Sequence, residues 1–322
     1  MKKVKIGLLG FGNVGGGTYK ILTDNREIIQ QRIGASPEIT RILQRNRKKK
    51  RLVEADPALL TEDPDDIIKD PDIDIVVEML GGIEPATSFM VQAMKHGKHV
   101  VSANKAAIAA NYDLLTETAA ENNVEFLFEA SVAGGIPVLT AITGALASNN
   151  FVEVMGILNG TTNYILTKMT DEGLSYDEVL KDAQAKGFAE ADPTADVEGI
   201  DAANKLSILI ALAFDRYIAP GDIPTTGITA ITAKDIEEAA AQGKKIKLIG
   251  RASVADGKLS YQVKPVLLDI THPLAGVSNE FNAVYITGDM VGELMFYGRG
   301  AGPLPTGSAV CGDILAIMKK RF

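Results

Sequence analysis

Residues 4–15 read VKIGLLGFGNVG, and this stretch decides the architecture of the first part of the chain. The apolar run over 4–9 has the length and composition of a buried strand. Gly10, Gly12 and Gly15 then follow the pattern G-x-G-x-x-G, and apolar residues recur at helical spacing over 14–31. A strand, a glycine turn and a helix in this order predict the first repeat of a parallel α/β sheet.

The glycines of such a turn have separate physical tasks. Gly10 permits a tight turn, Gly12 lets the backbone approach a diphosphate, and Gly15 lets helix and strand pack closely. The diphosphate lies at the helix N-terminus, where unbonded N–H groups and the helix dipole favour an anion. A glycine turn without a ligand is the alternative. We predict a dinucleotide site formed by Gly10, Phe11, Gly12, Asn13, Val14 and Gly15.

Strand-like and helix-like segments alternate through the rest of the first domain. Strands are expected over 39–43, 73–79, 99–102 and 124–129, with a helix over 85–96. Buried strands alternating with amphipathic helices predict a Rossmann-type, doubly wound parallel sheet with helices on both faces. This domain is expected to span residues 1–135 and to be joined by a C-terminal helix over 306–322.

The pattern changes after residues 134–137, and residues 136–305 are expected to form a second, α+β domain. Helices are predicted over 162–171 and 176–186, and another follows an acidic stretch. Strand candidates at 152–160, 244–250, 259–267 and 283–288 predict a mixed sheet.

Composition excludes several classes of protein. A length of 322 residues suggests about two domains. The net charge of −8 argues against general nucleic-acid binding. One cysteine, Cys311, permits no internal disulfide and suits a reducing cytoplasm, and with three histidines it is too few for a zinc site. No stretch approaches the roughly 20 apolar residues of a membrane span.

A basic segment follows the second expected strand. Residues 40–51 hold seven basic residues and no acid. NAD enzymes usually carry an acid there, and NADP enzymes a basic residue that binds the 2′-phosphate. NADP is therefore the preferred cofactor and NAD a possible one. Arg45 is the best candidate for the phosphate, and Arg41 or Arg47 could serve instead. A solvated loop or a nucleic-acid patch would also account for the charge.

Three further segments end expected strands of the first domain. Because ligands bind outside the carboxyl ends of parallel strands, Leu80 and Gly81 are expected beside the dinucleotide, and so are Ser102, Ala103 and Lys105. Lys105 is alternatively a surface lysine. The turn that begins at Glu129 could gather backbone carbonyls around a hard cation, or it could be an ordinary turn before a helix.

The acidic stretch FAEADPTADVEGIDAANK, residues 188–205, leads into an apolar run typical of a buried helix. Asp201 and Lys205 are four residues apart, so they share a helix face. A lysine that faces several carboxylates can exchange a proton, while the carboxylates hold a substrate ammonium group. The alternative is a solvated loop with one surface ion pair.

These segments together resemble the homoserine dehydrogenase family. The motifs that carry the resemblance are GLLGFGNVGGG (7–17), SANK (102–105), FEASVAGGIP (128–137), GILNGTTNYILTKM (156–169), GFAEADPTADVEGIDAANK (187–205), NEFNAVYITGD (279–289) and FYGRGAGPLPTGSAV (296–310). They cover nearly the whole chain, and the acidic motif is the specific one.

The resemblance implies an NAD(P)-dependent oxidoreductase that reversibly reduces L-aspartate 4-semialdehyde to L-homoserine in threonine and methionine biosynthesis. It implies a homodimer paired through sheet strands, with residues 136–305 as the substrate-binding and dimerisation domain. Lys205 and Lys105 match catalytic lysines, and Gly302 matches a glycine near the cofactor. The substrate-binding candidates are Glu190, Asp196, Asp201 and Thr162. Glu129, with the carbonyls of Val132, Gly134 and Ile136, matches a site for sodium or potassium.

Two departures and two rival interpretations accompany this resemblance. Many members carry a C-terminal ACT domain for feedback, and this sequence ends without one, so feedback of that kind is not expected. The basic segment is unusual and leaves cofactor preference open. A phosphorylating semialdehyde dehydrogenase would need a cysteine nucleophile, and Cys311 lies in an expected helix. A dinucleotide sensor without catalysis would lack the lysine and carboxylates.

Overall fold

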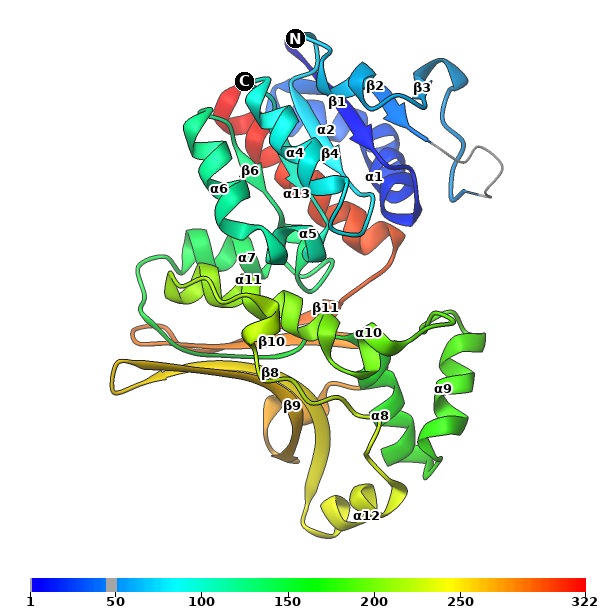
Figure 1. Ribbon diagram of the computed structural model, residues 1–322, viewed down its shortest axis with the longest axis vertical. Helices are drawn as coiled ribbons and strands as arrows, with labels where there is room; N and C mark the ends of the chain where they lie inside the picture. Colours follow the sequence, from blue (N-terminus) through cyan, green and yellow to red (C-terminus); the bar gives the residue numbers. More distant parts are fainter. Residues whose placement is uncertain (1, 45–50) are drawn as a thin grey trace. The chain divides into compact units, whose positions relative to one another are not determined.

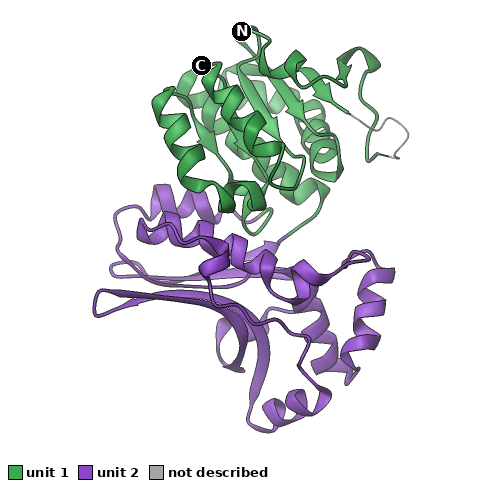
Figure 2. Cartoon of the chain, in the orientation of Figure 1, with its two compact units in different colours: residues 1–135, 301–322 green, residues 136–300 purple. Residues whose placement is uncertain are grey.

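The structure is a computed structural model that describes residues 2–44 and 51–322. The chain divides into two compact units, which Figure 2 colours green and purple. The first unit contains residues 1–135 and 301–322, and the second contains residues 136–300. The candidate site Arg45 lies outside the described residues.

The first unit is built on a six-stranded sheet in the order β3-β2-β1-β4-β5-β6 (Figure 1). Every pairing in this sheet is parallel. The strands are β1 (Lys2–Leu9), β2 (Ala35–Leu43), β3 (Leu60–Thr61), β4 (Ile75–Glu78), β5 (His99–Ser102) and β6 (Phe126–Leu127). The strand order reverses between β1 and β4, and such a switch point is where dinucleotides bind in open α/β sheets. The predicted doubly wound fold is confirmed.

The helices of the first unit are α1 (Asn13–Asp24), α2 (Arg26–Ile33), α3 (Asp65–Ile68), α4 (Ala86–Lys95), α5 (Lys105–Ala110), α6 (Tyr112–Glu121) and α13 (Pro303–Arg321), with short 3₁₀ turns η1 (Pro57–Leu59) and η2 (Glu129–Ser131). The single helix expected over 14–31 is two helices, because Asn25 ends α1 and begins α2 with φ −99° and ψ 14°. The last strand is shorter than expected, since the chain enters η2 at Glu129.

The side chains of β1 point alternately to the two faces of the sheet, and both faces are buried in the first unit. Ile6 and Leu8 pack with Leu22 of α1 and Ile314 of α13 in one apolar cluster. Gly7 faces the other way, where an added Cβ would lie 2.5 Å from the side chain of Ile67 in α3. This two-residue period is the geometry of a strand buried on both faces.

Helix α13 packs on α1 at backbone contact distance. A Cβ on Gly17 would lie 1.9 Å from the carbonyl oxygen of Pro303, and one on Gly307 would lie 2.8 Å from the carbonyl carbon of Gly17. Only glycine fits such an approach. The C-terminal helix is therefore an integral part of the first unit, and Val310, Ile314 and Met318 lie in its core.

The second unit contains a five-stranded sheet in the order β11-β10-β7-β8-β9. The strands are β7 (Phe151–Ile157), β8 (Lys244–Ala255), β9 (Lys258–Asp269), β10 (Phe281–Gly288) and β11 (Gly292–Arg299). All pairings between these strands are antiparallel, so the expectation of a mixed sheet is wrong in this respect. The physical reason is local. Asp256 and Gly257 both have positive φ and form a two-residue hairpin turn, which forces β8 and β9 to run antiparallel.

The helices of the second unit are α7 (Val138–Thr140), α8 (Gly160–Glu172), α9 (Tyr176–Ala185), α10 (Thr194–Val197), α11 (Ile200–Phe214) and α12 (Ala233–Ala241), with a π-helical turn η3 (Ala141–Ala145) and 3₁₀ turns η4 (Pro220–Asp222) and η5 (Pro273–Gly276). Helix α11 is buried over most of its length, as its apolar sequence predicts. Among the described residues, no helix has the length and apolarity needed to cross a membrane.

Candidate functional site

The glycine turn has the geometry that a diphosphate requires. Gly10 has φ +110°, a value that favours glycine, and a Cβ on Gly15 would lie 2.4 Å from the carbonyl oxygen of Gly10. A Cβ on Gly12 would meet nothing within 4 Å, so the turn opens into free space at this position. Gly12 is the N-cap of α1, and no side chain caps the helix. The first N–H groups of α1, from Asn13 onward, therefore fit an anionic diphosphate.

Arg51 contacts this turn, and sequence reasoning did not single it out. Its Nη1 donates a hydrogen bond of 2.5 Å to the carbonyl oxygen of Phe11, and the residue is half-buried. Arg51 was counted only as one of seven basic residues, and no spacing rule indicates which of them returns to the glycine turn. Gln44, which follows β2, stands where NAD enzymes usually carry an acid.

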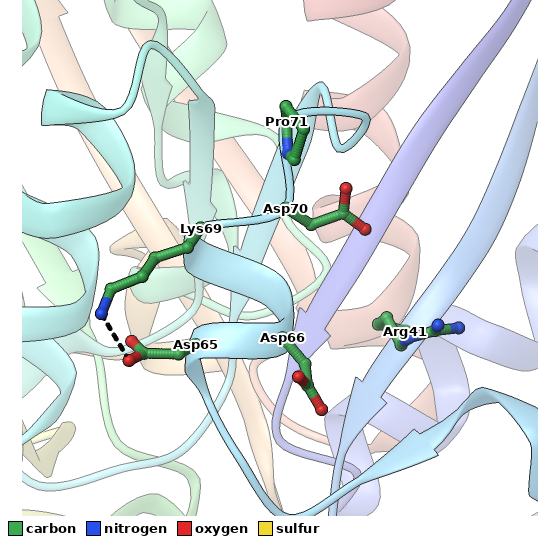
Figure 3. Close-up of a pocket in the computed structure, with 6 residues that line it drawn as sticks. All are labelled: Arg41, Asp65, Asp66, Lys69, Asp70 and Pro71. Atoms are coloured by element: carbon green, nitrogen blue, oxygen red, sulfur yellow. Dashed lines mark hydrogen bonds and ion pairs between the residues drawn. The ribbon is translucent and has the colours of Figure 1, made fainter.

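Arg41 lies elsewhere. It is exposed on β2 and lines an open hollow of about 360 Å³ with Asp65, Asp66, Lys69, Asp70 and Pro71 (Figure 3). In the view of Figure 3, Asp66 lies between the Arg41 side chain and the pair of Lys69 with Asp65, whose charged atoms are 2.6 Å apart. Three carboxylates outnumber two cations in this lining, which disfavours a phosphate. Arg41 is therefore a poor candidate for the 2′-phosphate.

The carboxyl ends of β4 and β5 hold five of the expected cofactor residues. Leu80 and Gly81 follow β4, and Gly81 has φ +97°. Ser102 is fully buried at the end of β5, and half-buried Ala103 comes next. Half-buried Lys105 is the first residue of α5, which Asn104 caps by accepting a 3.1 Å hydrogen bond from the Ala107 N–H. Ser102 ends β5, and the other four residues follow the carboxyl ends of the paired parallel strands β4 and β5, which is where Rossmann folds bind their cofactor.

Gly302 is the N-cap of α13 and has φ +128°. The next residue, Pro303, is the one that contacts Gly17 of α1. The start of α13 therefore lies against the helix that follows the glycine turn, which is a position compatible with cofactor contact.

The expected cation turn is buried and tightly wound. Glu129 is 5% exposed and begins η2, and Val132 follows in extended conformation. Ala133 and Gly134 both have positive φ, a rare conformation for alanine. Ile136 opens the second unit, where its carbonyl accepts a 2.8 Å hydrogen bond from Val138. Such a turn reorients successive carbonyls, which is how backbone oxygens are gathered around a cation.

Asp313 of α13 bonds to the turn that begins at Glu129. Its Oδ2 accepts a 2.8 Å hydrogen bond from the backbone N–H of Glu129. Burial raises the pKa of Asp313 to about 8, although the bond from Glu129 opposes the shift. Among the described residues, no group of three or more His, Cys, Asp or Glu side chains is placed so that it could hold a metal ion. The expected set has one carboxylate and three carbonyls, so this absence does not bear on it.

In the second unit, α11 carries a buried ion pair. Lys205 Nζ lies 2.7 Å from Asp201 Oδ2 and donates a second hydrogen bond of 2.7 Å to the carbonyl oxygen of Leu158. The side chains of Lys205 and Asp201 are 9% and 6% exposed. The four-residue spacing on a helix produces the pair, and the carbonyl at the end of β7 orients the ammonium group. The sequence predicts the contact of Lys205 with Asp201, whereas the contact with the Leu158 carbonyl depends on the tertiary fold.

Asn159 is the centre of the surrounding network, and sequence reasoning missed it. Its Nδ2 donates to Asp196 Oδ1 at 2.7 Å and to Asp201 Oδ2 at 2.9 Å. Its Oδ1 accepts the N–H of Thr162 at 2.8 Å and so caps α8. The sequence does contain a signal for this residue. Asn159 lies between an expected strand and an expected helix, and asparagine is favoured there as the N-cap of the helix. One amide thus joins two candidate carboxylates to the N-terminus of α8.

The other expected substrate residues differ in position. Thr162 is 1% exposed within this network, and Asp196 also accepts a 3.0 Å hydrogen bond from Thr161. Glu190 is exposed on the loop between α9 and α10, where its carbonyl accepts a bond from Gln184. The described contacts therefore join Lys205, Asp201, Asp196 and Thr162, and leave Glu190 outside the network.

The arrangement supports two kinds of chemistry. A buried ammonium beside a carboxylate can stabilise charge on a substrate oxygen and exchange a proton with it. A second carboxylate, Asp196, is joined to the first through Asn159 and can neutralise a substrate amine. A helix N-terminus beside them favours a substrate carboxylate.

Two family models match the chain. The one described as homoserine dehydrogenase, NAD binding domain, matches residues 10–129, and the one described as homoserine dehydrogenase matches residues 137–315. Together they cover most of both units. Of the candidate residues, Val132, Gly134 and Ile136 lie between the two matches, and Gly302 of the first unit falls in the second match.

Individual proteins agree with this assignment. A homoserine dehydrogenase of Bacillus subtilis is 46% identical over 99% of this chain and 74% of its own length. The crystal structure of a homoserine dehydrogenase from Thiobacillus denitrificans is 43% identical, covers 99% of this chain and 74% of that one, and has a TM-score of 0.94. A hyperthermophilic archaeal homoserine dehydrogenase in complex with NADPH is 26% identical, with a TM-score of 0.80 over 99% of this chain and 98% of that one.

Proposed function

Because the chain belongs to the homoserine dehydrogenase family, whose members interconvert L-homoserine and L-aspartate 4-semialdehyde, we propose that Lys205 moves the proton of this reaction. The chain is an NAD(P)-dependent oxidoreductase of amino-acid biosynthesis. The observation that carries the proposal is the buried pair of Lys205 and Asp201, held by Leu158 and linked through Asn159 to Asp196.

The bound nicotinamide accepts or supplies the hydride, and residues of the chain do the rest. In oxidation, the Lys205 amine takes the proton of the homoserine hydroxyl group. In reduction, its ammonium stabilises the negative charge that develops on the carbonyl oxygen and then donates the proton. Asp201 favours the ammonium form by its charge, and the bond to Leu158 fixes the direction of the amine.

The substrate is an amino acid, so its ammonium group and its carboxylate each need a binding partner of suitable charge or polarity. We assign its ammonium group to Glu190, Asp196 and Asp201, because carboxylates are the side chains that neutralise an amine. Its carboxylate is assigned to Thr162 at the N-terminus of α8. We also propose Lys105 of the first unit as a second catalytic lysine. The burial of Asp201 and Thr162 supports these roles, since buried polar groups make stronger contacts than solvated ones.

We further propose that NADP is the preferred cofactor and that NAD is a weaker one. The chain has no acid in the segment after β2, and Arg51 bonds to the glycine turn at Phe11. A guanidinium at this turn suits the 2′-phosphate because it binds phosphate oxygens in a fixed, forked geometry.

Initial rates of homoserine oxidation with NADP and with NAD test both the reaction and the preference. We expect turnover with both and a higher kcat/KM with NADP. Arg51→Gln should lower kcat/KM for NADP about tenfold more than for NAD, the size of one charged hydrogen bond. Arg41→Gln, an exposed substitution on β2, is the control and should change neither value. A preference for NAD in the wild-type enzyme would refute the cofactor proposal, and an absence of turnover would refute the proposed chemistry.

The Glu129 turn is proposed as a sodium or potassium site with the carbonyls of Val132, Gly134 and Ile136. The burial of the Glu129 side chain supports it, because a cation offsets the cost of burying a carboxylate. Activity should rise with added sodium or potassium salts over N-methylglucamine salts, and Glu129→Gln should abolish this response. Glu121→Gln, an exposed change on α6, is the control. A wild-type activity that is the same in sodium, potassium and N-methylglucamine salts would contradict the proposed cation site.

We propose that the chain forms a homodimer through the sheet of the second unit. The edge strand β11 supports this, because Met295 and Tyr297 lie on one face of it and are 41% and 52% exposed. Sedimentation should give twice the chain mass of 34.2 kDa, and Tyr297→Glu should shift the protein toward the monomer. A wild-type monomer at micromolar concentration would exclude the dimer.

A further inference from the structure

Glu78 is a fully buried acid at the switch point of the first sheet. It is the last residue of β4, where it pairs with Leu9 of β1 on one side and with Ser102 of β5 on the other. No residue of the candidate site explains why a carboxylate is needed here. An apolar residue would cost less to bury, so the polar contacts of Glu78 must offset this cost.

The Glu78 carboxylate joins the turns that follow two neighbouring strands. Its Oε1 accepts the N–H of Leu80 at 2.7 Å, and its Oε2 accepts the hydroxyl of Ser102 at 2.6 Å. Asn104 Nδ2 contacts Oε1 at 3.4 Å and donates to the carbonyl oxygen of Gly82 at 2.7 Å. The same Ser102 hydroxyl accepts the N–H of Asn104 at 3.1 Å.

Lys105 is connected to this network through the cap of its helix. The Asn104 side chain bonds to the turn after β4 and also accepts the N–H of Ala107, which fixes the first turn of α5. Lys105 is the first residue of that turn. A rotation of Asn104 would therefore move both the backbone of Lys105 and the turn at Gly82.

We propose that Glu78 is a positioning residue that holds Leu80, Gly81 and Lys105 in the arrangement needed for cofactor binding and proton transfer. It acts through Ser102 and Asn104 and is not itself a contact of the reacting atoms. This inference rests on the roles proposed above for Lys105 and for the turn after β4.

The carboxylate group of Glu78 suits this network because of its acceptor atoms. A carboxylate offers only acceptors, and its known partners all donate, so each bond is satisfied without competition. Burial raises the pKa of Glu78 above its ordinary value, and the bonds from Ser102 and Leu80 offset only part of this shift. Glutamine in its place would turn one oxygen into a donor that faces the donating Ser102 hydroxyl.

The test compares Glu78→Gln and Glu78→Ala with Ser36→Ala. Ser36 is also buried, accepts side-chain bonds from Gln30 and Arg26, and lies at the opposite, amino end of the sheet. We expect Glu78→Gln to raise the Kd of NADPH, measured by its fluorescence, about tenfold and to lower kcat as well. Glu78→Ala should have the larger effect, and Ser36→Ala should leave Kd and kcat unchanged.

A double-mutant cycle with Ser102→Ala distinguishes positioning from general destabilisation. If Glu78 acts through Ser102, the two substitutions together should raise Kd by clearly less than the product of their single effects. Equal melting temperatures in Glu78→Gln and Ser36→Ala, with a changed Kd only in the former, would support the proposal. An unchanged Kd and kcat in Glu78→Gln would overturn it, as would strict additivity. Because Kd needs no turnover, these results stand apart from any failure of the proposed chemistry.

Discussion

Lys205→Met should lower kcat about a thousandfold, within the range that general acid–base catalysis contributes. Methionine keeps the length and the apolar body of the side chain but has no proton to give or accept. The negative charge that develops on the substrate oxygen during reduction then lacks its ammonium partner. The Kd of NADPH should stay within about twofold of wild type, because the glycine turn and its contacts lie in the first unit.

Lys168→Met on α8 is the matched control for this experiment. Lys168 also pairs with an acid four residues away, Glu172, but their side chains are 25% and 47% exposed, against 9% and 6% for Lys205 and Asp201. An exposed pair of this kind contributes little to stability, so kcat should be unchanged. Near-wild-type kcat in Lys205→Met would exclude Lys205 as the proton donor and would move that role to Lys105.

The second large effect concerns stability and pH, and it involves Lys247 of β8. This lysine is 2% exposed, and its Nζ donates to Asn163 Oδ1 at 2.9 Å and to the carbonyl oxygen of Val277 at 2.6 Å. Burial lowers the pKa of Lys247 to about 8; Lys245 lowers it further and Asp171 opposes the shift. In the unfolded chain the same amine titrates at 10.5.

Between pH 8 and 10.5 the unfolded chain therefore binds a proton that the folded chain has released. The free energy of unfolding should rise with pH across this window, by about 3 kcal/mol for a shift of about two and a half units. Below pH 8 both states are protonated, and the cost of burying the charge is constant. Lys247→Met should lack this rise, so its stability relative to wild type should fall as the pH increases.

Urea unfolding followed by circular dichroism at pH 7.5 and pH 9.5 measures this difference. Lys258→Met, an exposed substitution on the paired strand β9, is the control and should follow wild type at both values. A constant difference between Lys247→Met and wild type would mean that Lys247 keeps its proton in the folded state throughout this range.

The parts of the fold that could be predicted are those with local causes. The strand, the glycine turn and the beginning of α1 follow from a run of apolar residues and three spaced glycines. Strand β11 was missed because its side chains alternate between exposed and half-buried, so neither face has the continuous apolar character of a core strand. The antiparallel order of the second sheet depends on short hairpin turns, and the apolar pattern of a strand does not encode the direction in which it runs.

The candidate site also contains residues that the local sequence predicts and residues that it does not. The pair of Asp201 and Lys205 follows from a spacing of four on a helix. Asn159 and Arg51 act through contacts with residues distant in the sequence, and each has many equivalent neighbours of its type. Such contacts are created by the path of the chain in three dimensions, which no local pattern encodes.

The membership of α13 in the first unit has a consequence for synthesis on the ribosome. Residues 136–300 are continuous, so the second unit can complete its fold as soon as it has emerged. The sheet of the first unit is made about two hundred residues earlier, yet the apolar cluster on one face of β1 is incomplete until Val310, Ile314 and Met318 have been made. The first unit can therefore complete its core only after residues 303–321 have been made, and its incomplete apolar face is the surface that a chaperone would have to shield until then.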